Sequence, residues 1–144
     1  MITKQQFEEM TTRDKLLELA RFLVEEVKSP WFDLNSWAEK GFPEKACGTT
    51  ACAVGWATVC FPQCGLKLWR SAGAHSDSLA LLYELGDETF HGIYAVRTFF
   101  GISPDEAEYL FLSYTYERRS NKRTNVAKRL KEIARRYHPR AGIK

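Results

Sequence analysis

Four cysteines and three histidines are the residues of this chain best suited to metal binding or nucleophilic chemistry. Zinc needs four nitrogen or sulfur ligands in a tetrahedron, usually supplied as two close pairs such as Cys-x2-Cys. The cysteines here are more loosely spaced, and two of them lie about 12 Å apart along one expected helix. We therefore expect buried thiols, with no metal site and no cofactor. The cysteines are Cys47, Cys52, Cys60 and Cys64.

A cysteine at the N-terminus of a helix has a lowered pKa and can act as a nucleophile. Cys47 and Cys52 fit that position, which gives a cysteine-dependent hydrolase as a third functional hypothesis. Such an enzyme needs a base, and His75, His91 and His138 stand in no recognisable motif. No catalytic residue is therefore assigned, and whether the chain is an enzyme stays open.

The segment Gly48, Thr49 and Thr50 precedes an expected buried helix and is the candidate ligand site. Free N–H groups and the helix dipole attract anions at such a position, and the two hydroxyls add donors. A nucleotide-like ligand would place phosphate here and a ring against Trp56. Alternatively, Thr49 or Thr50 merely caps the helix. The segment lacks the Lys and Gly spacing of a P-loop.

The C-terminal residues 117–144 are strongly basic, with eleven Lys and Arg against two Glu, whereas the rest of the chain is net acidic. Such a segment suits a nucleic-acid backbone, and nearby tyrosine rings suit stacked bases. Alternatively, it is a solvated face partly paired with the acidic body. No pattern typical of sequence-specific reading is present. The candidate nucleic-acid contacts are Arg118, Arg119, Lys122, Arg123, Lys128 and Arg129.

Three helical segments are expected in the first half of the chain. Apolar residues at helical spacing predict a helix over Thr12–Lys28, and Thr11 with Asp14 fits a capping box at its start. A short turn over Thr3–Met10 is expected to pack against it. Cys47–Phe61 is small or apolar on every side, which predicts a central helix buried all round.

The middle of the chain is harder to assign. Leu66–Arg70 and Leu79–Leu85 are short apolar runs that fit a two-stranded hairpin, although the second run suits a helix equally well. Thr89–Phe100 is expected to be helical, with Tyr94 among its inward residues and Gly101 as its C-cap.

The last third of the chain has clearer helix signals. Ser103-Pro104-Asp105-Glu106 combines an N-cap, a first-position proline and acidic residues, and predicts a helix that ends near Tyr114. Asn125–Tyr137 predicts a final amphipathic helix after a basic connector. We expect a mainly α fold, in which one compact domain over 1–144 is built around a buried central helix. The alternative is an α+β fold that adds one small β-hairpin.

The composition is that of a folded domain, with 44% hydrophobic and 27% charged residues. No apolar run approaches the roughly 18–20 residues that span a bilayer, and the N-terminus lacks the apolar stretch of a signal peptide. We therefore expect a cytoplasmic protein that does not bind membranes. The oligomeric state stays open.

Two segments resemble a group of small phage and bacterial proteins to which no activity is attached. Cys47–Ala57 is similar to their Cys-Gly-Thr-x-x-Cys-x-x-Gly-(Trp or His)-Ala segment. Phe99–Ala107, with Leu110 and Phe111, resembles their second shared segment. The resemblance implies a phage-type accessory protein acting on host machinery, and it carries over no residue roles.

These patterns lead to a ranked set of functions. The first is a non-enzymatic binding protein that holds a partner protein or a small anionic, nucleotide-like ligand. The second is non-specific nucleic-acid binding through the basic C-terminal segment, and the third is the hydrolase.

Overall fold

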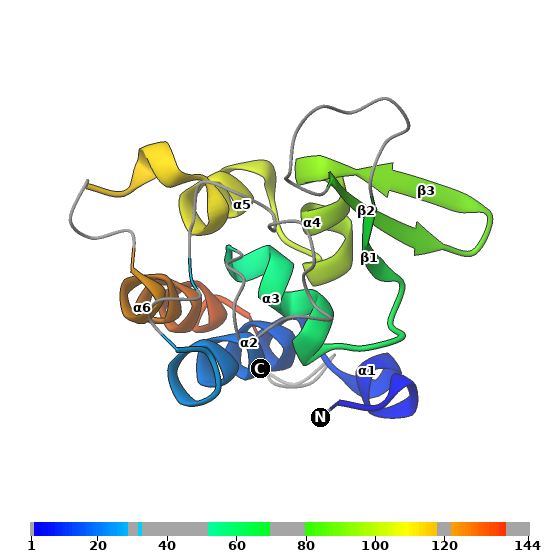
Figure 1. Ribbon diagram of the computed structural model, residues 1–144, viewed down its shortest axis with the longest axis horizontal. Helices are drawn as coiled ribbons and strands as arrows, with labels where there is room; N and C mark the ends of the chain where they lie inside the picture. The colour runs from blue at the N-terminus through cyan, green and yellow to red at the C-terminus, as the bar shows by residue number, and fades with distance from the viewer. Residues whose placement is uncertain (1, 29–31, 33–51, 70–79, 118–121, 138–144) are drawn as a thin grey trace.

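The computed structural model describes residues 2–28, 32, 52–69, 80–117 and 122–137. Within these residues the chain forms six α-helices and one three-stranded antiparallel sheet, which confirms the mainly α, α+β fold class. The elements are α1 (Lys4–Glu9), α2 (Thr12–Glu25), α3 (Ala53–Cys60), β1 (Leu66–Trp69), β2 (Ala80–Leu85), β3 (Glu88–His91), α4 (Gly92–Phe100), α5 (Pro104–Phe111), a short 3-10 helix (Ser113–Thr115) and α6 (Arg123–Ala134) (Figure 1).

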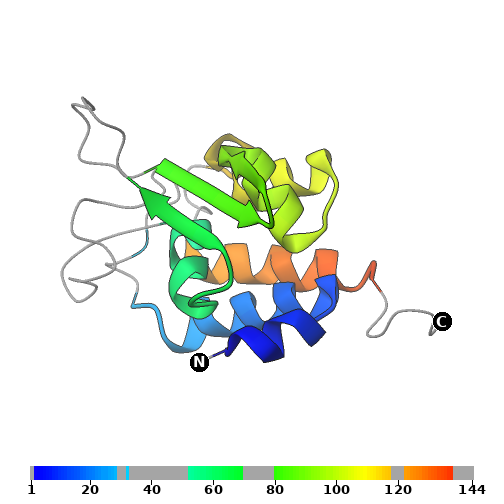
Figure 2. The same ribbon diagram turned by 90° about the vertical axis from the view of Figure 1, so that its right-hand side faces the viewer.

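Helices α2 and α6 form one layer of the molecule. They lie side by side below the sheet and α4, and α3 lies between the two layers (Figures 1 and 2). Both helices are amphipathic, so each turns one apolar stripe inward. None of the described helices is both long and apolar enough to cross a membrane. The buried stripe residues are Leu16, Leu19, Leu23, Val126, Leu130 and Ile133.

The central helix α3 is shorter than the sequence predicts. It is buried over most of its surface, as expected from its small and apolar residues, but it begins at Ala53 with Cys52 as the N-cap. The prediction that Thr49 or Thr50 caps this helix is therefore wrong. Cys52 makes no side-chain capping hydrogen bond, and both it and the first residues of α3, Ala53 and Val54, are buried.

The sheet has one strand more than the predicted hairpin. β1 and β2 confirm the hairpin, but Glu88–His91 forms β3 on β2, and the predicted helix over Thr89–Phe100 begins only at Gly92. Gly86 turns the chain with a φ of +60° and returns it along β2. Tyr94 was expected to face inward and is instead 63% exposed.

Three helix caps are those that the sequence predicts. The capping box of Thr11 with Asp14 starts α2, and that of Ser103 with Glu106 starts α5. Gly101 ends α4 in the left-handed conformation. Four helix boundaries differ from the prediction, because α2 ends at Glu25, α5 ends at Phe111, and the final helix begins at Arg123 and ends at Ala134.

Phenylalanine rings join the two layers where α1, α3 and α4 meet. The ring of Phe61, which follows α3, lies 5.8 Å from that of Phe7, 5.5 Å from Phe99 and 6.3 Å from Phe100. Offset and edge-to-face contacts at these distances are favourable. This cluster fixes the position of α1, which contributes only Phe7 to the core, against α4 and the end of α3.

Candidate binding groove

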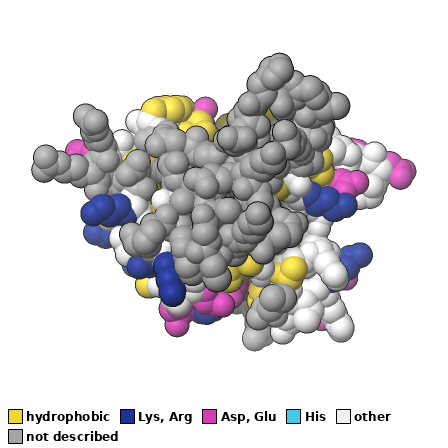
Figure 3. Space-filling model, in the orientation of Figure 1, with side chains coloured by type: hydrophobic (Ala, Val, Ile, Leu, Met, Phe, Trp, Pro, Cys, Tyr) yellow, Lys and Arg dark blue, Asp and Glu magenta, His cyan; other side chains and the backbone are white. Residues whose placement is uncertain are grey.

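A groove of about 650 Å³ separates α1 from the turn end of the sheet, a volume in the usual range of ligand sites. The molecular outline is notched there, between the strands and α1 (Figure 3). The floor is apolar, and Leu85 stands at the rim with 52% of its surface exposed. The lining residues are Lys4, Phe7, Glu8, Gln63, Cys64, Gly65, Lys67, Tyr83, Glu84, Leu85 and Gly86.

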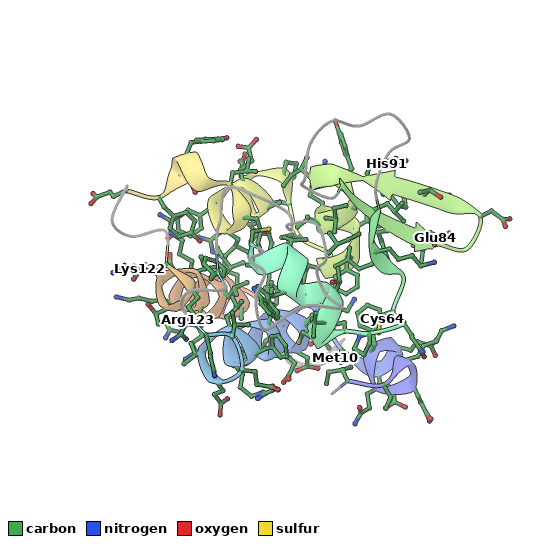
Figure 4. The ribbon with its side chains drawn as sticks, in the orientation of Figure 1. Met10, Cys64, Glu84, His91, Lys122 and Arg123 are labelled. Atoms are coloured by element: carbon green, nitrogen blue, oxygen red, sulfur yellow. The ribbon has the colours of Figure 1, made fainter. Side chains whose placement is uncertain are left out.

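An unusual turn after α3 brings Cys64 to the groove floor. Gln63 has a φ of +60° and Gly65 a φ of +96°. The carbonyl of Gly65 accepts a 3.0 Å hydrogen bond from the N–H of Glu84, and a Cβ on Gly65 would lie 2.6 Å from the Glu84 carbonyl oxygen. Only glycine allows this close approach. Cys64 is thereby held next to α1 (Figure 4).

The thiol of Cys64 is neutral at physiological pH. Burial raises its pKa, and the nearby ammonium of Lys15 opposes this effect only in part. The Sγ–H donates to the carbonyl of Pro62 at 3.3 Å. Lys15 itself donates to the carbonyl of Phe99 at 3.0 Å, and its Nζ lies 4.4 Å from the ring centroid of Phe7. Burial lowers the pKa of this lysine as well.

The rim of the groove carries balanced charges. Lys67 of β1 and Glu84 of β2 form an ion pair, and both side chains stay about half exposed. Lys4 and Glu8 line the opposite side, from α1. Two cations and two carboxylates thus surround an apolar floor. The groove offers no excess of positive charge to a small anion.

Only part of the predicted anion site can be placed. Gly48, Thr49 and Thr50 lie outside the described residues. Trp56 is 3% exposed, and its ring is tilted against that of Phe22 at a centroid distance of 6.4 Å. Trp56 therefore belongs to the core and presents no open ring face on which a ligand could stack.

Arg123, a predicted nucleic-acid contact, is bound to the end of α2. Its Nη1 donates to the carbonyls of Leu23 and Val24, each at 3.0 Å. These carbonyls belong to the last turn of α2, where cations are favourable. In Figure 4 Arg123 lies beside α2, next to Lys122, which is exposed.

Arg129 is also engaged within the protein. Its guanidinium donates to the carbonyl of Tyr109 at 2.6 Å, and to the carbonyl and hydroxyl of Thr115 at 2.8 and 3.0 Å. Its Cζ lies 3.5 Å from the ring centroid of Tyr116 and 4.1 Å from that of Tyr109. The neighbouring Lys128 is exposed.

The six predicted nucleic-acid contacts thus divide into three groups. Lys122 and Lys128 face solvent, Arg123 and Arg129 hold α6 to the body, and residues 118 and 119 lie outside the described part of the chain. Lys and Arg side chains still gather over α6 on one side of the molecule (Figure 3). Helix α6 therefore carries a basic face, but Arg123 and Arg129 of this face are engaged in hydrogen bonds within the protein.

The described cysteines are buried thiols, as the sequence predicts for Cys52, Cys60 and Cys64, whereas Cys47 lies outside the described residues. Burial raises the pKa of Cys60 far above its ordinary value. Across residues 2–28, 52–69, 80–117 and 122–137, no three His, Cys, Asp or Glu side chains form a group suited to a metal ion.

A second hollow, of about 560 Å³, lies between α5 and α6. Burial acts to raise the pKa of Glu106, but hydrogen bonds from Ser103 and Tyr137, together with the charge of Arg136, outweigh burial and lower it. The Nη1 of Arg136 lies 3.5 Å from the carboxylate. Because these groups satisfy one another, we interpret the hollow as the outer side of a structural brace.

The groove residues were not identified from the sequence. They come from α1, from the turn after α3 and from the two central strands, and no local pattern links them. One local signal for the groove was available, because Thr3 and Gln6 form a capping box that marks α1 as a true helix.

No protein family, curated protein or solved structure matches the chain.

Proposed function

We propose that the protein is a non-enzymatic binding protein that holds an extended segment of a partner protein in the groove between α1 and the sheet. The observation that carries this proposal is the groove itself, whose volume suits a bound segment and whose floor of Phe7, Cys64 and Tyr83 is apolar. A partner side chain would pack on this floor, next to the exposed Leu85.

The rim charges favour a peptide over a small anion. Lys4 and Lys67 stand with Glu8 and Glu84, so the groove is complementary to a segment that carries both signs of charge. A site for a free nucleotide would be expected to present a net positive charge or clustered N–H donors.

The described thiols support a binding role rather than hydrolysis. A cysteine nucleophile reacts as the thiolate, whereas burial raises the pKa of Cys64 and keeps it protonated. A hydrolase also needs a base next to the thiol. His91 is the one histidine among the described residues, and it lies apart from Cys64 on a different element (Figure 4).

A photo-crosslinking amino acid placed at Leu85 tests the proposal in cells that make the protein naturally. Leu17 of α2 is the matched control, because it is also an exposed leucine but lies outside the groove. We expect a defined protein adduct from position 85 and none from position 17. Identical adducts from both positions, or none from 85, would contradict the proposal.

Non-specific nucleic-acid binding is the alternative function, and the salt dependence of binding distinguishes it from partner binding in the groove. Binding to a nucleic-acid backbone weakens steeply as salt rises because counterions are released. The logarithm of affinity falls with the logarithm of salt concentration with a slope of about 0.9 per phosphate contact. If binding falls in this way and is lost when Lys122 and Lys128 are replaced by Ser, the basic face is the functional surface. Partner binding in the groove should survive both changes.

A further inference from the structure

The outward side of α4 presents an exposed tyrosine beside an arginine. The opposite side of this helix is buried, with Val96 and Phe99 fully enclosed. Tyr94 is 63% exposed, and the Cζ of Arg97 lies 5.6 Å from the centroid of its ring. This distance is within the range of a cation–π contact, so the two side chains form one unit on the surface.

One nitrogen of Arg97 lacks any hydrogen-bond partner. Its Nε is closed off from solvent and has no acceptor within the part of the chain that the structure describes. The ion pairs formed between described residues do not include Arg97. Arg123 and Arg129, in contrast, donate to backbone carbonyls. A buried donor without an acceptor is costly, so it requires a specific explanation.

The helix dipole explains only part of this arrangement. A cation in the last turn of α4 is favourable, which accounts for the positive charge of Arg97. It does not account for the burial of Nε, because a lysine would supply the same charge and keep its ammonium in water. What remains unexplained is the edge of the Arg97 guanidinium that carries the buried Nε–H. The N–H groups along this edge have the spacing that binds two oxygens of an oxyanion.

We propose that Arg97 and Tyr94 form a binding site for an oxyanion group, a carboxylate or a phosphate, carried on a flat aromatic body. The Nε–H and one Nη–H of Arg97 donate in parallel to two oxygens, and the ring of Tyr94 stacks on the aromatic body. In this proposal the exposed Tyr94 side chain, whose ring lies 5.6 Å from Cζ of Arg97, moves to admit the ligand to the Nε edge. Neither residue lines the groove beside α1, so this site is independent of the proposed function.

Nuclear magnetic resonance tests the site directly, because the Nε–Hε group of each arginine gives its own signal. We would titrate the labelled protein with phenyl phosphate, benzoate and inorganic phosphate. The Arg97 signal should shift saturably with the two aromatic anions, and the tighter of these identifies the preferred oxyanion. Arg97→Lys should weaken binding about tenfold, the loss of roughly one bidentate contact. Tyr94→Ala should abolish the preference for phenyl phosphate over inorganic phosphate.

An Arg97 signal that does not move, or that drifts linearly like that of exposed Arg135, would overturn the proposal. Thermal unfolding provides a second measurement that does not depend on the ligand. Arg97→Met should melt no lower than the parent protein, because it removes an unpaired buried donor. If the arginine serves only the helix dipole, Arg97→Met should melt lower and Arg97→Lys should melt like the parent, and that result also counts against the site.

Discussion

Arg129 gives the sharpest test of how the basic segment is used. Replacing it with Met removes three hydrogen bonds that the charged guanidinium donates, one to Tyr109 and two to Thr115. It also removes the contacts with the rings of two tyrosines. Charged hydrogen bonds contribute about 1.5–3 kcal/mol each, and cation–π contacts at half-exposed sites about 0.5–1 kcal/mol. Because Arg129 is half-buried, the freed acceptors regain water, and we expect a net loss of roughly 2–4 kcal/mol.

Urea unfolding followed by tryptophan fluorescence measures this loss. Arg129→Lys keeps the charge but loses the planar fork, so an intermediate loss of about 1–2 kcal/mol is expected. The matched control is Lys128→Met, which removes the same charge one residue earlier and should change stability by less than about 0.5 kcal/mol. If Arg129→Met is as stable as this control, while the salt slope of DNA binding falls by nearly one, the arginine is a phosphate contact and our assignment is refuted.

Three further changes test the groove turn, the central helix and the brace between α5 and α6. Gly65→Ala should lower the free energy of unfolding in urea by roughly 2–4 kcal/mol, because its Cβ would collide with the Glu84 carbonyl. The control Gly86→Ala has open space around its Cβ and should lower it by only about 1–2 kcal/mol. Equal losses would contradict the close approach at Gly65. Gly55→Leu should overpack the buried α3 and lower stability by roughly 1–3 kcal/mol, and a variant that melts like the parent would remove α3 from the core. The depressed pKa of Glu106 means that its stabilisation is present above the ordinary value of 4.5 and is lost as pH falls through the lower folded-state pKa. Glu106→Gln should therefore reduce the difference in stability between about pH 7 and pH 3, and an unchanged difference would exclude the brace.

The starts of α2 and α5 and the end of α4 were predictable because their signals are local. The capping boxes at Thr11 and Ser103 and the left-handed Gly101 lie within a few residues of the structure that they determine. β3 was not predictable in this way. Its residues are mostly exposed, and only pairing with β2 makes them a strand. That pairing overrides the helical spacing of the sequence from Thr89 onward.

The candidate groove could not be read from the sequence, because it depends on three segments that are distant in the chain. The sequence presents Cys64 only as a buried thiol or a candidate metal ligand, and its place in the groove follows from the positive φ values on both sides of it. Gly65, directly before the strand-like run, is a second local hint, since glycine beside a strand often marks a close backbone approach. The hint gives no information about α1, which forms the opposite wall.

The basic run shows why charge counts overstate possible phosphate contacts. Adjacent residues on a helix point about 100° apart, so neighbours such as Lys128 and Arg129 have different surroundings. The partners of Arg123 and Arg129 are backbone carbonyls that become available where α2 and α5 end, and residue type does not mark such carbonyls. An arginine at such a position satisfies these carbonyls and fixes the final helix on the body. Of the four described candidates, only Lys122 and Lys128 remain for phosphate, and two contacts correspond to a salt slope of about 1.8. A much steeper measured slope would require contacts beyond these residues.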